Sequence, residues 1–229
     1  MSIPLRLARW SEIHALVVLA ATAFVLAGAS LWSLIAAAAV SFAGFIWTCR
    51  AGWPRPDRFD PANALTTARL AGVLLLPSIA PVATGLVLAA CAIALFALDA
   101  VDGWLARKIG VTSEFGEYLD KEADAFFMLV LCLLLHADGR LGAWIIAPGL
   151  LRYGFVFFLM LARPRALKER RSTRGRWIYF GMISALIAGF TPFPLLYRPC
   201  VAAMSLALVY SFAETVFDLY RAVPAARES

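Results

Sequence analysis

The sequence predicts an all-α integral membrane protein. Of its 229 residues, 62% are hydrophobic and only 16% are charged, and the mean hydropathy is +0.78. Long uncharged runs recur along the chain, and the first extends from residue 13 to residue 47. Because lipid cannot hydrogen-bond to open backbone groups, such runs cross it as helices. The composition excludes an arrangement of one or two soluble domains.

Two spans are expected first, at about 13–28 and 31–48. The run that contains them is too long for one crossing of about 20 residues, and a break falls at Gly28–Ser30. The residues before it lack a cleavable-signal pattern, so we expect the first span to be retained. A basic, proline-rich loop at 50–62 then leads to the rest of the chain.

Six further spans follow in the remaining sequence. Asn63 is a good helix start, because Pro61 precedes it by two residues. The expected spans run from 63 to a turn at Pro77–Pro81, and then over 84–107, 115–136, 141–162, 177–191 and 198–220. Together with the first two they give eight crossings, so both chain ends should lie on one side.

The basic residues orient these spans. In the loops and at the span ends, only Arg140 and Arg198 fall on one side, whereas all the others gather on the opposite side. This asymmetry identifies the Arg- and Lys-rich side as cytoplasmic. The net charge of +6 is therefore explained by topology, and we expect no nucleic-acid partner.

Four carboxylates stand at the cytoplasmic ends of two neighbouring spans. Asp99 and Asp102 are three residues apart, and Asp120 and Asp124 are four apart, so each pair shares one helix face. Charges at membrane helix ends are costly and mark functional sites. Converging acids need a counter-charge, which two divalent cations would supply. Oxygen ligands without His or Cys favour Mg²⁺ or Mn²⁺ over zinc.

Small residues and one arginine share the faces of these acids. Gly103 and Ala106 remove bulk beside the first pair, Gly116 does so beside the second, and Arg107 follows one turn after Gly103. Acids for metal, small residues for a flat group and an arginine for phosphate indicate a site for a metal-bound nucleotide diphosphate. The alternative is a set of interfacial acids paired with nearby basic residues.

Polar residues also occupy the first turns of the span that starts at Asn63. Thr66 and Thr67 follow Asn63, and Arg69 lies about one turn further in. One interpretation is helix capping with a snorkelling arginine. The other is a polar lip at a positive helix end that faces an anionic ligand. The residues alone favour neither.

The central stretch resembles the signature of the CDP-alcohol phosphatidyltransferase family at every fixed position. The matching residues are Asp99, Asp102, Gly103, Ala106, Arg107, Gly116, Asp120 and Asp124. The segment PANALTTAR also resembles the start of the family's first core span. The resemblance implies a six-helix catalytic membrane domain at 61–220, preceded by a two-span extension at 1–60 and followed by a polar tail at 221–229.

The resemblance also implies a reaction and a set of roles. An alcohol attacks the lipid-bearing phosphorus of CDP-diacylglycerol, and CMP leaves. Asp99, Asp102 and Asp120 would bind two divalent cations, and Asp124 would bind metal and act as the base. The residues that would hold the cytidine diphosphate are Gly103, Ala106, Arg107, Gly116, Asn63 and Thr66. Family members are usually homodimers, and the active site would face the cytoplasm at a bacterial inner membrane.

The acceptor alcohol is not determined by this stretch. Arg152 within a span, and Lys168, Arg171 and Arg174 in the basic loop, are candidates for binding an anionic acceptor. Glycerol 3-phosphate is the first choice from family frequency, and inositol phosphate the second. Serine, an uncharged alcohol, or a soluble CDP-headgroup used with diacylglycerol stay open. The sequence LDKEADAFF departs from the LDPLADK of phosphatidylglycerophosphate synthases.

Two interpretations from other classes fit the residues less well. A cation transporter would place acids near the bilayer midplane and would show repeated halves, whereas these acids stand at span ends and no repeat is visible. An inactive scaffold usually loses at least one acid of the signature, and all four are present.

Overall fold

The computed structural model describes residues 3–50, 53, 60–109, 113–162 and 173–222, and only the backbone at 3–4, 100, 102–109, 173 and 218–222. This part of the chain is helical throughout and contains no strand. Its helices are α1 (Ile3–Leu26), α2 (Leu31–Thr48), α3 (Pro61–Ile79), α4 (Gly85–Ile109), α5 (Glu114–Ala137), η2 (Ala143–Ile145), α6 (Ile146–Ala162), α7 (Thr173–Ala188) and α8 (Pro194–Ala222). The all-α prediction is confirmed.

Each of the eight expected spans coincides with one α-helix of the described chain. By length and composition, five of these helices are able to cross a membrane, namely α1, α2, α3, α6 and α8. In α4 the apolar part is the shorter segment Gly85–Asp99, and α7 has 16 residues. The protein is therefore an integral membrane protein.

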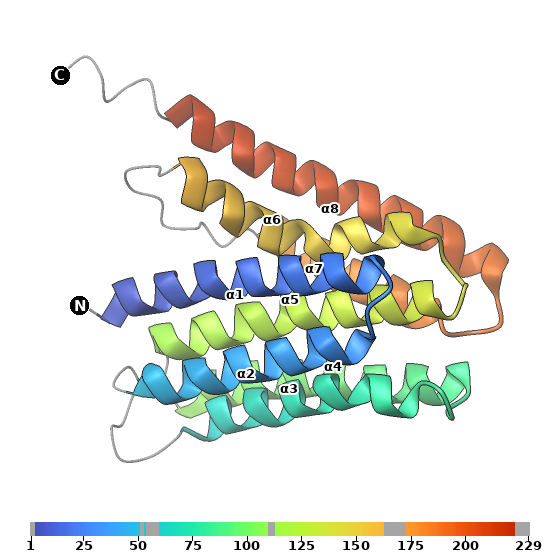
Figure 1. Cartoon of the computed structure of the whole chain (residues 1–229), viewed down its shortest axis with the longest axis horizontal. Helices are drawn as coiled ribbons and strands as arrows, with labels where there is room; N and C mark the ends of the chain where they lie inside the picture. Colours follow the sequence, from blue (N-terminus) through green and yellow to red (C-terminus); the bar gives the residue numbers. More distant parts are fainter. Residues whose placement is uncertain (1–2, 51–52, 54–59, 110–112, 163–172, 223–229) are drawn as a thin grey trace.

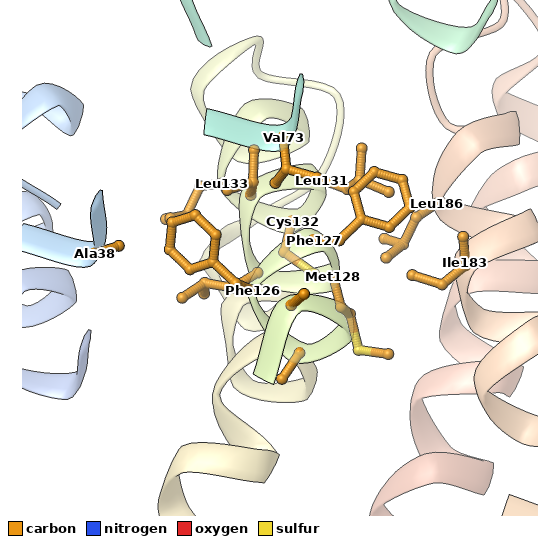
Figure 2. Close-up of a cluster of buried hydrophobic side chains, with 14 of the residues drawn as sticks. Ala38, Val73, Phe126, Phe127, Met128, Leu131, Cys132, Leu133, Ile183 and Leu186 are labelled. Carbon is orange, nitrogen blue, oxygen red and sulfur yellow. The ribbon is translucent and has the colours of Figure 1, made fainter. Parts of the chain in front are cut away.

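Helix α5 lies at the centre of the bundle and contacts α1, α3, α6 and α7. Every residue from Ala125 to Leu135 is buried. Figure 2 shows its side chains reaching Ala38 of α2 on one side and Ile183 and Leu186 of α7 on the other. Because other helices rather than lipid surround α5, its first turns can carry acids that would be unfavourable on a lipid-facing helix.

Helix α1 begins at Ile3, about ten residues before the expected span. The reason is tertiary packing, because Leu7, Trp10 and Ser11 are buried against the rest of the bundle. The turn into α2 contains Gly28 at φ 102°, a left-handed conformation that favours glycine. Ser30 then caps α2 by accepting a hydrogen bond from the backbone N–H of Trp32.

The hairpin of α1 and α2 is anchored to the core by stacked aromatic rings. The rings of Trp10 and Phe45 lie 3.8 Å apart, and Phe45 in turn stacks on Phe115 of α5 at 4.7 Å. Phe42 meets Phe126 edge-on at 5.9 Å. The predicted extension at 1–60 therefore contributes to the same hydrophobic cluster as the core helices.

A buried polar contact joins the same hairpin to α5 and α6. Glu122 of α5 is fully buried. Its Oε1 accepts a hydrogen bond of 2.7 Å from Ser11 Oγ of α1 and one of 2.9 Å from Arg152 Nη2 of α6. The arginine supplies the charge that a buried carboxylate requires, so three helices are tied together at one point.

Both ends of the described chain lie at one end of the bundle. Helix α1 begins there, α8 ends there, and α5 begins there with the acid-bearing turns (Figure 1). This arrangement agrees with the expectation that the termini and the acid pairs share one side of the membrane.

The aromatic anchor gives a stability prediction. Replacing the fully buried Phe45 by Ala is expected to destabilise the protein by about 3–5 kcal/mol, because it removes the ring between Trp10 and Phe115 and leaves a cavity. Thermal unfolding in detergent would measure the loss. Phe24→Ala is the matched control, since that ring is 67% exposed. Equal melting temperatures for the two variants would contradict the anchoring role.

Candidate functional site

A buried arginine forms ion pairs with three aspartates from two other helices. Arg69 of α3 has a side chain only 2% exposed and forms an ion pair with Asp99 of α4. It also pairs with Asp120 at 3.1 Å and with Asp124 at 2.9 Å, both on α5. The arginine inside an apolar span thus satisfies its charge within the protein, as intramembrane charges must.

The acids are brought together by helix geometry. Asp120 and Asp124 are one turn apart on α5 and therefore point the same way. Asp99 approaches from α4, and one carboxylate oxygen of each acid lies within 4.8 Å of the others. The predicted convergence of Asp99 with Asp120 and Asp124 is present in the structure. The side chain of Asp102 lies outside the described residues.

This donor set fits a divalent cation. Three ionised carboxylates carry more negative charge than the single guanidinium of Arg69 balances. Their side chains are 27%, 45% and 23% exposed for Asp99, Asp120 and Asp124, whereas that of Arg69 is 2% exposed, so an ion can reach the exposed part of the acids. Carboxylate oxygens are the ligands that Mg²⁺ and Mn²⁺ prefer.

The first turns of α3 and α5 approach each other closely next to the acids. Gly116 N–H donates to Ser113 Oγ at 3.0 Å, which caps α5. A Cβ on Gly116 would lie 2.6 Å from Asn63 Oδ1, so only glycine fits there without movement. The glycine of the predicted nucleotide site therefore allows α3 and α5 to pack in contact.

Asn63 carries a buried polar group that faces no acceptor in the described part of the chain. The residue is 5% exposed, and its Nδ2 has no hydrogen-bond partner among the described residues. Buried amides are normally satisfied, so this donor is suited to a bound ligand. Thr66, one turn later, is also buried and donates to the carbonyl of Ala62 at 3.1 Å.

The remaining residues of the predicted nucleotide site are only partly visible. Gly103, Ala106 and Arg107 lie in the helical backbone of α4, but their side-chain surroundings are outside the described residues. Their roles stay predictions.

The residues predicted to bind the acceptor are dispersed. Arg152 pairs with Glu122 of α5. Glu122 is two residues from Asp120 and two from Asp124. Because each residue of a helix turns by 100°, Glu122 lies on the side of α5 opposite these two acids. Arg174 is exposed and pairs with Glu214 of α8 at 2.9 Å. Lys168 and Arg171 lie outside the described residues. The described candidates therefore do not meet at the acids in this conformation, and their role stays a prediction.

An apolar groove of about 640 Å³ runs between α4 and α7 and includes Asp99 in its lining. Most of the other lining residues are apolar: Ala89, Ile93, Phe96, Ala97, Tyr179, Phe180, Ile187 and Ala188. The hydroxyl of Tyr179 also donates to the backbone carbonyl of Asp124 at 3.4 Å. The groove thus connects the acids with a surface suited to a hydrocarbon chain.

Sequence reasoning missed two parts of this site. The sequence left open that the Arg69 side chain extends to the membrane surface, and its pairing with the aspartates was not predicted. Its position inside an apolar run is nevertheless typical of an arginine with buried acidic partners. Tyr179 carries no signal in the sequence, because its approach to Asp124 depends on how α7 packs against α5.

A comparison with known protein families agrees with this geometry. Residues 59–217 match the family model of the CDP-alcohol phosphatidyltransferases. The match begins just before α3 and ends within α8, so it covers the six helices α3–α8 and leaves out the hairpin of α1 and α2.

The close approach at Gly116 can be tested with paired glycine variants. Gly116→Ala is expected to destabilise the protein by about 1–3 kcal/mol, because the new methyl group collides with Asn63. Gly44→Ala is the control, since nothing lies within 4 Å of the position that its methyl group would take, and it should gain up to about 1 kcal/mol from helix propensity. Thermal unfolding compares them. A Gly116→Ala variant as stable as Gly44→Ala would show that the contact is not tight.

Proposed function

We propose, from the premise that the chain belongs to the CDP-alcohol phosphatidyltransferase family, that it transfers the phosphatidyl group of CDP-diacylglycerol to a hydrophilic alcohol and releases CMP. The observation that carries this proposal is the convergence of Asp99, Asp120 and Asp124 beside an apolar groove. A lipid phosphate and a charged nucleotide would both find suitable surroundings there. This is a step of phospholipid synthesis.

Two divalent cations, Mg²⁺ or Mn²⁺, are proposed to bind at the acids. Asp99, Asp102, Asp120 and Asp124 would hold them, and when bound they would neutralise the diphosphate and stabilise charge that develops on it. The exposed sides of Asp99 and Asp120 give a ligand a way in. The carboxylates of the two helices would fix the positions of the ions, and the diphosphate would be oriented through them.

Asp124 is proposed as the base. Its carboxylate would accept the proton of the acceptor hydroxyl as the hydroxyl oxygen forms its bond to the lipid-bearing phosphorus. The bond from that phosphorus to the bridging diphosphate oxygen breaks, and CMP leaves with the electron pair. Of the three clustered acids Asp124 is the least exposed, at 23%, which keeps it away from bulk water.

The nucleotide is proposed to lie across the first turns of α3 and α5 and the last turns of α4. Gly103, Ala106 and Gly116 would make room for the cytidine, and Arg107 would contact its phosphates. Asn63 supports this placement because its buried Nδ2 has no partner in the described chain. Thr66 is proposed to line the same pocket.

The groove between α4 and α7 is proposed to hold an acyl chain of the donor lipid. It begins at Asp99 and its lining extends to Thr191, just beyond the end of α7. A hydrocarbon chain placed there would be shielded from water while its phosphate stays beside the acids. This arrangement explains why the acids are found at the edge of an apolar surface.

Glycerol 3-phosphate is the proposed acceptor, and another phosphorylated polyol such as inositol phosphate is the next choice. Arg152, Lys168, Arg171 and Arg174 are the proposed contacts for its phosphate. Serine, an uncharged alcohol, or a reaction between a CDP-headgroup and diacylglycerol are the alternatives that the assay below distinguishes.

The active site is proposed to face the cytoplasm of a bacterial inner membrane, as the distribution of Arg and Lys predicts. A homodimer is proposed from the family's usual state. Soluble acceptors and CMP would then exchange on the side where they are made and used.

The experiment that tests the function measures CMP release and product-lipid mass. Purified protein with CDP-diacylglycerol and Mg²⁺ or Mn²⁺ is offered glycerol 3-phosphate, inositol phosphate, serine and uncharged alcohols in turn. We expect CMP release with a phosphorylated polyol only, and none after chelation. If CDP-diacylglycerol yields no CMP with any acceptor, the proposal fails, and CMP release from a CDP-headgroup with diacylglycerol would then establish the alternative reaction.

The role of Asp124 predicts a specific kinetic defect. Asp124→Asn should abolish turnover, because the amide cannot accept the proton, while part of the nucleotide binding persists. Turnover assays and binding of a CDP-lipid would be measured on the same preparation. Asp138→Asn is the control, an exposed acid paired with Arg140 beyond the other end of α5, and it should retain activity. Near-normal turnover of the Asp124 variant would show that another group is the base.

Filling the groove should impair use of long-chain donors. Ala97→Trp places a large ring in the groove lining and is expected to raise KM several-fold for a long-chain CDP-lipid, with a smaller effect on a short-chain analogue. Ala36→Trp, at an exposed position of α2, serves as control and should leave KM unchanged. Equal effects on both chain lengths would argue against an acyl chain in the groove.

A further inference from the structure

Arg69 contacts the acidic cluster in a regular way. It reaches the Oδ1 atom of each of the three aspartates and uses Nη1 for Asp99 and Asp124 and Nη2 for Asp120. No acid presents both oxygens to the guanidinium in these contacts. Arg69 is the most buried member of the cluster, and all three carboxylates are more exposed than it is.

The charge of Arg69 is permanent under physiological conditions. A guanidinium keeps its proton in proteins, and this one is 2% exposed, so water and salt screen it little. Three carboxylates with oxygens within 4.8 Å of one another repel strongly at low dielectric. Without a cation among them, the ionised carboxylates would push these helix ends apart.

A divalent ion and the guanidinium cannot occupy the same position. Mg²⁺ binds oxygen at about 2.0–2.1 Å, whereas the arginine nitrogens lie 2.9 and 3.1 Å from the oxygens of Asp124 and Asp120. Arg69 is buried, whereas each of the three acids is partly exposed. An ion that approaches the exposed part of the acids therefore meets carboxylates that Arg69 already holds together.

We propose that Arg69 is a built-in cation of the acidic site: it assembles Asp99, Asp120 and Asp124 when no metal is bound, and it stays paired with them when a divalent cation binds at their exposed part. Arg69 is thus a positioning residue that acts through the carboxylates. This inference rests on the proposed metal-dependent function for the identity of the incoming ion.

The test compares full-length wild-type protein with R69Q and R69K in detergent, by thermal unfolding after chelation and by Mn²⁺ binding followed through the spectroscopic signal of the free ion. R69Q should melt at a lower temperature without metal, because the acids repel. It should also bind Mn²⁺ several-fold more tightly than wild type and gain more stability from it, because the ion replaces the missing charge. R69K keeps the charge and should recover much of the metal-free stability.

A double variant separates charge from packing. D99N should raise the metal-free melting temperature in the R69Q background by removing one repelling charge, and lower it in wild type by removing a partner of Arg69. A purely structural arginine would give a loss in both backgrounds. If R69Q does not fold without metal, R69K and R69Q/D99N provide the comparison, and folding of R69Q in Mn²⁺ would support the proposal.

Several results would overturn it: an unchanged metal-free melting temperature in R69Q, weaker Mn²⁺ binding in R69Q than in wild type, or an R69K variant as unstable as R69Q. Turnover does not enter these readouts. A chain that shows the expected shifts but releases no CMP with any substrate would refute the proposed function and leave the role of Arg69 standing.

Discussion

The structure depends on keeping several charges paired inside an apolar bundle. Arg69 balances part of the charge of Asp99, Asp120 and Asp124, and Arg152 balances Glu122 on the other side of α5. Charges at membrane depth are tolerated only when they meet partners or water. The two clusters therefore determine which helices are neighbours: the first joins α3, α4 and α5, and the second joins α1, α5 and α6.

This constraint explains why α5 occupies the centre. Its first turns carry acids on two opposite faces, and its later turns are almost entirely apolar, with every residue from Ala125 to Leu135 buried. The acid-bearing turns of such a helix are unsuited to contact with lipid on either face. The acid-bearing end of α5 lies at the end of the bundle where α1 begins and α8 ends.

Much of this arrangement was predictable from the sequence, and the rest depends on tertiary packing. Uncharged runs predicted the eight helices, and the spacing of Asp120 and Asp124 predicted their shared face, because both follow from helical periodicity. The separate role of Glu122 was not predicted, because in the sequence it lies between Asp120 and Asp124. On the helix, however, its side chain is on the opposite face from those two acids. The docking of the hairpin through Trp10 and Phe45 follows from side-chain fit between distant segments, which no local pattern encodes.

The three aspartates around Arg69 are proposed to form a divalent-metal site. The most direct measurement is an experimental structure of the full chain with Mn²⁺, in which the ion is located by its anomalous scattering. We expect manganese within coordination distance of Asp99, Asp120 and Asp124, with Arg69 still paired to the same three acids. Manganese bound elsewhere, or bound in the place of the guanidinium with Arg69 turned away, would contradict it.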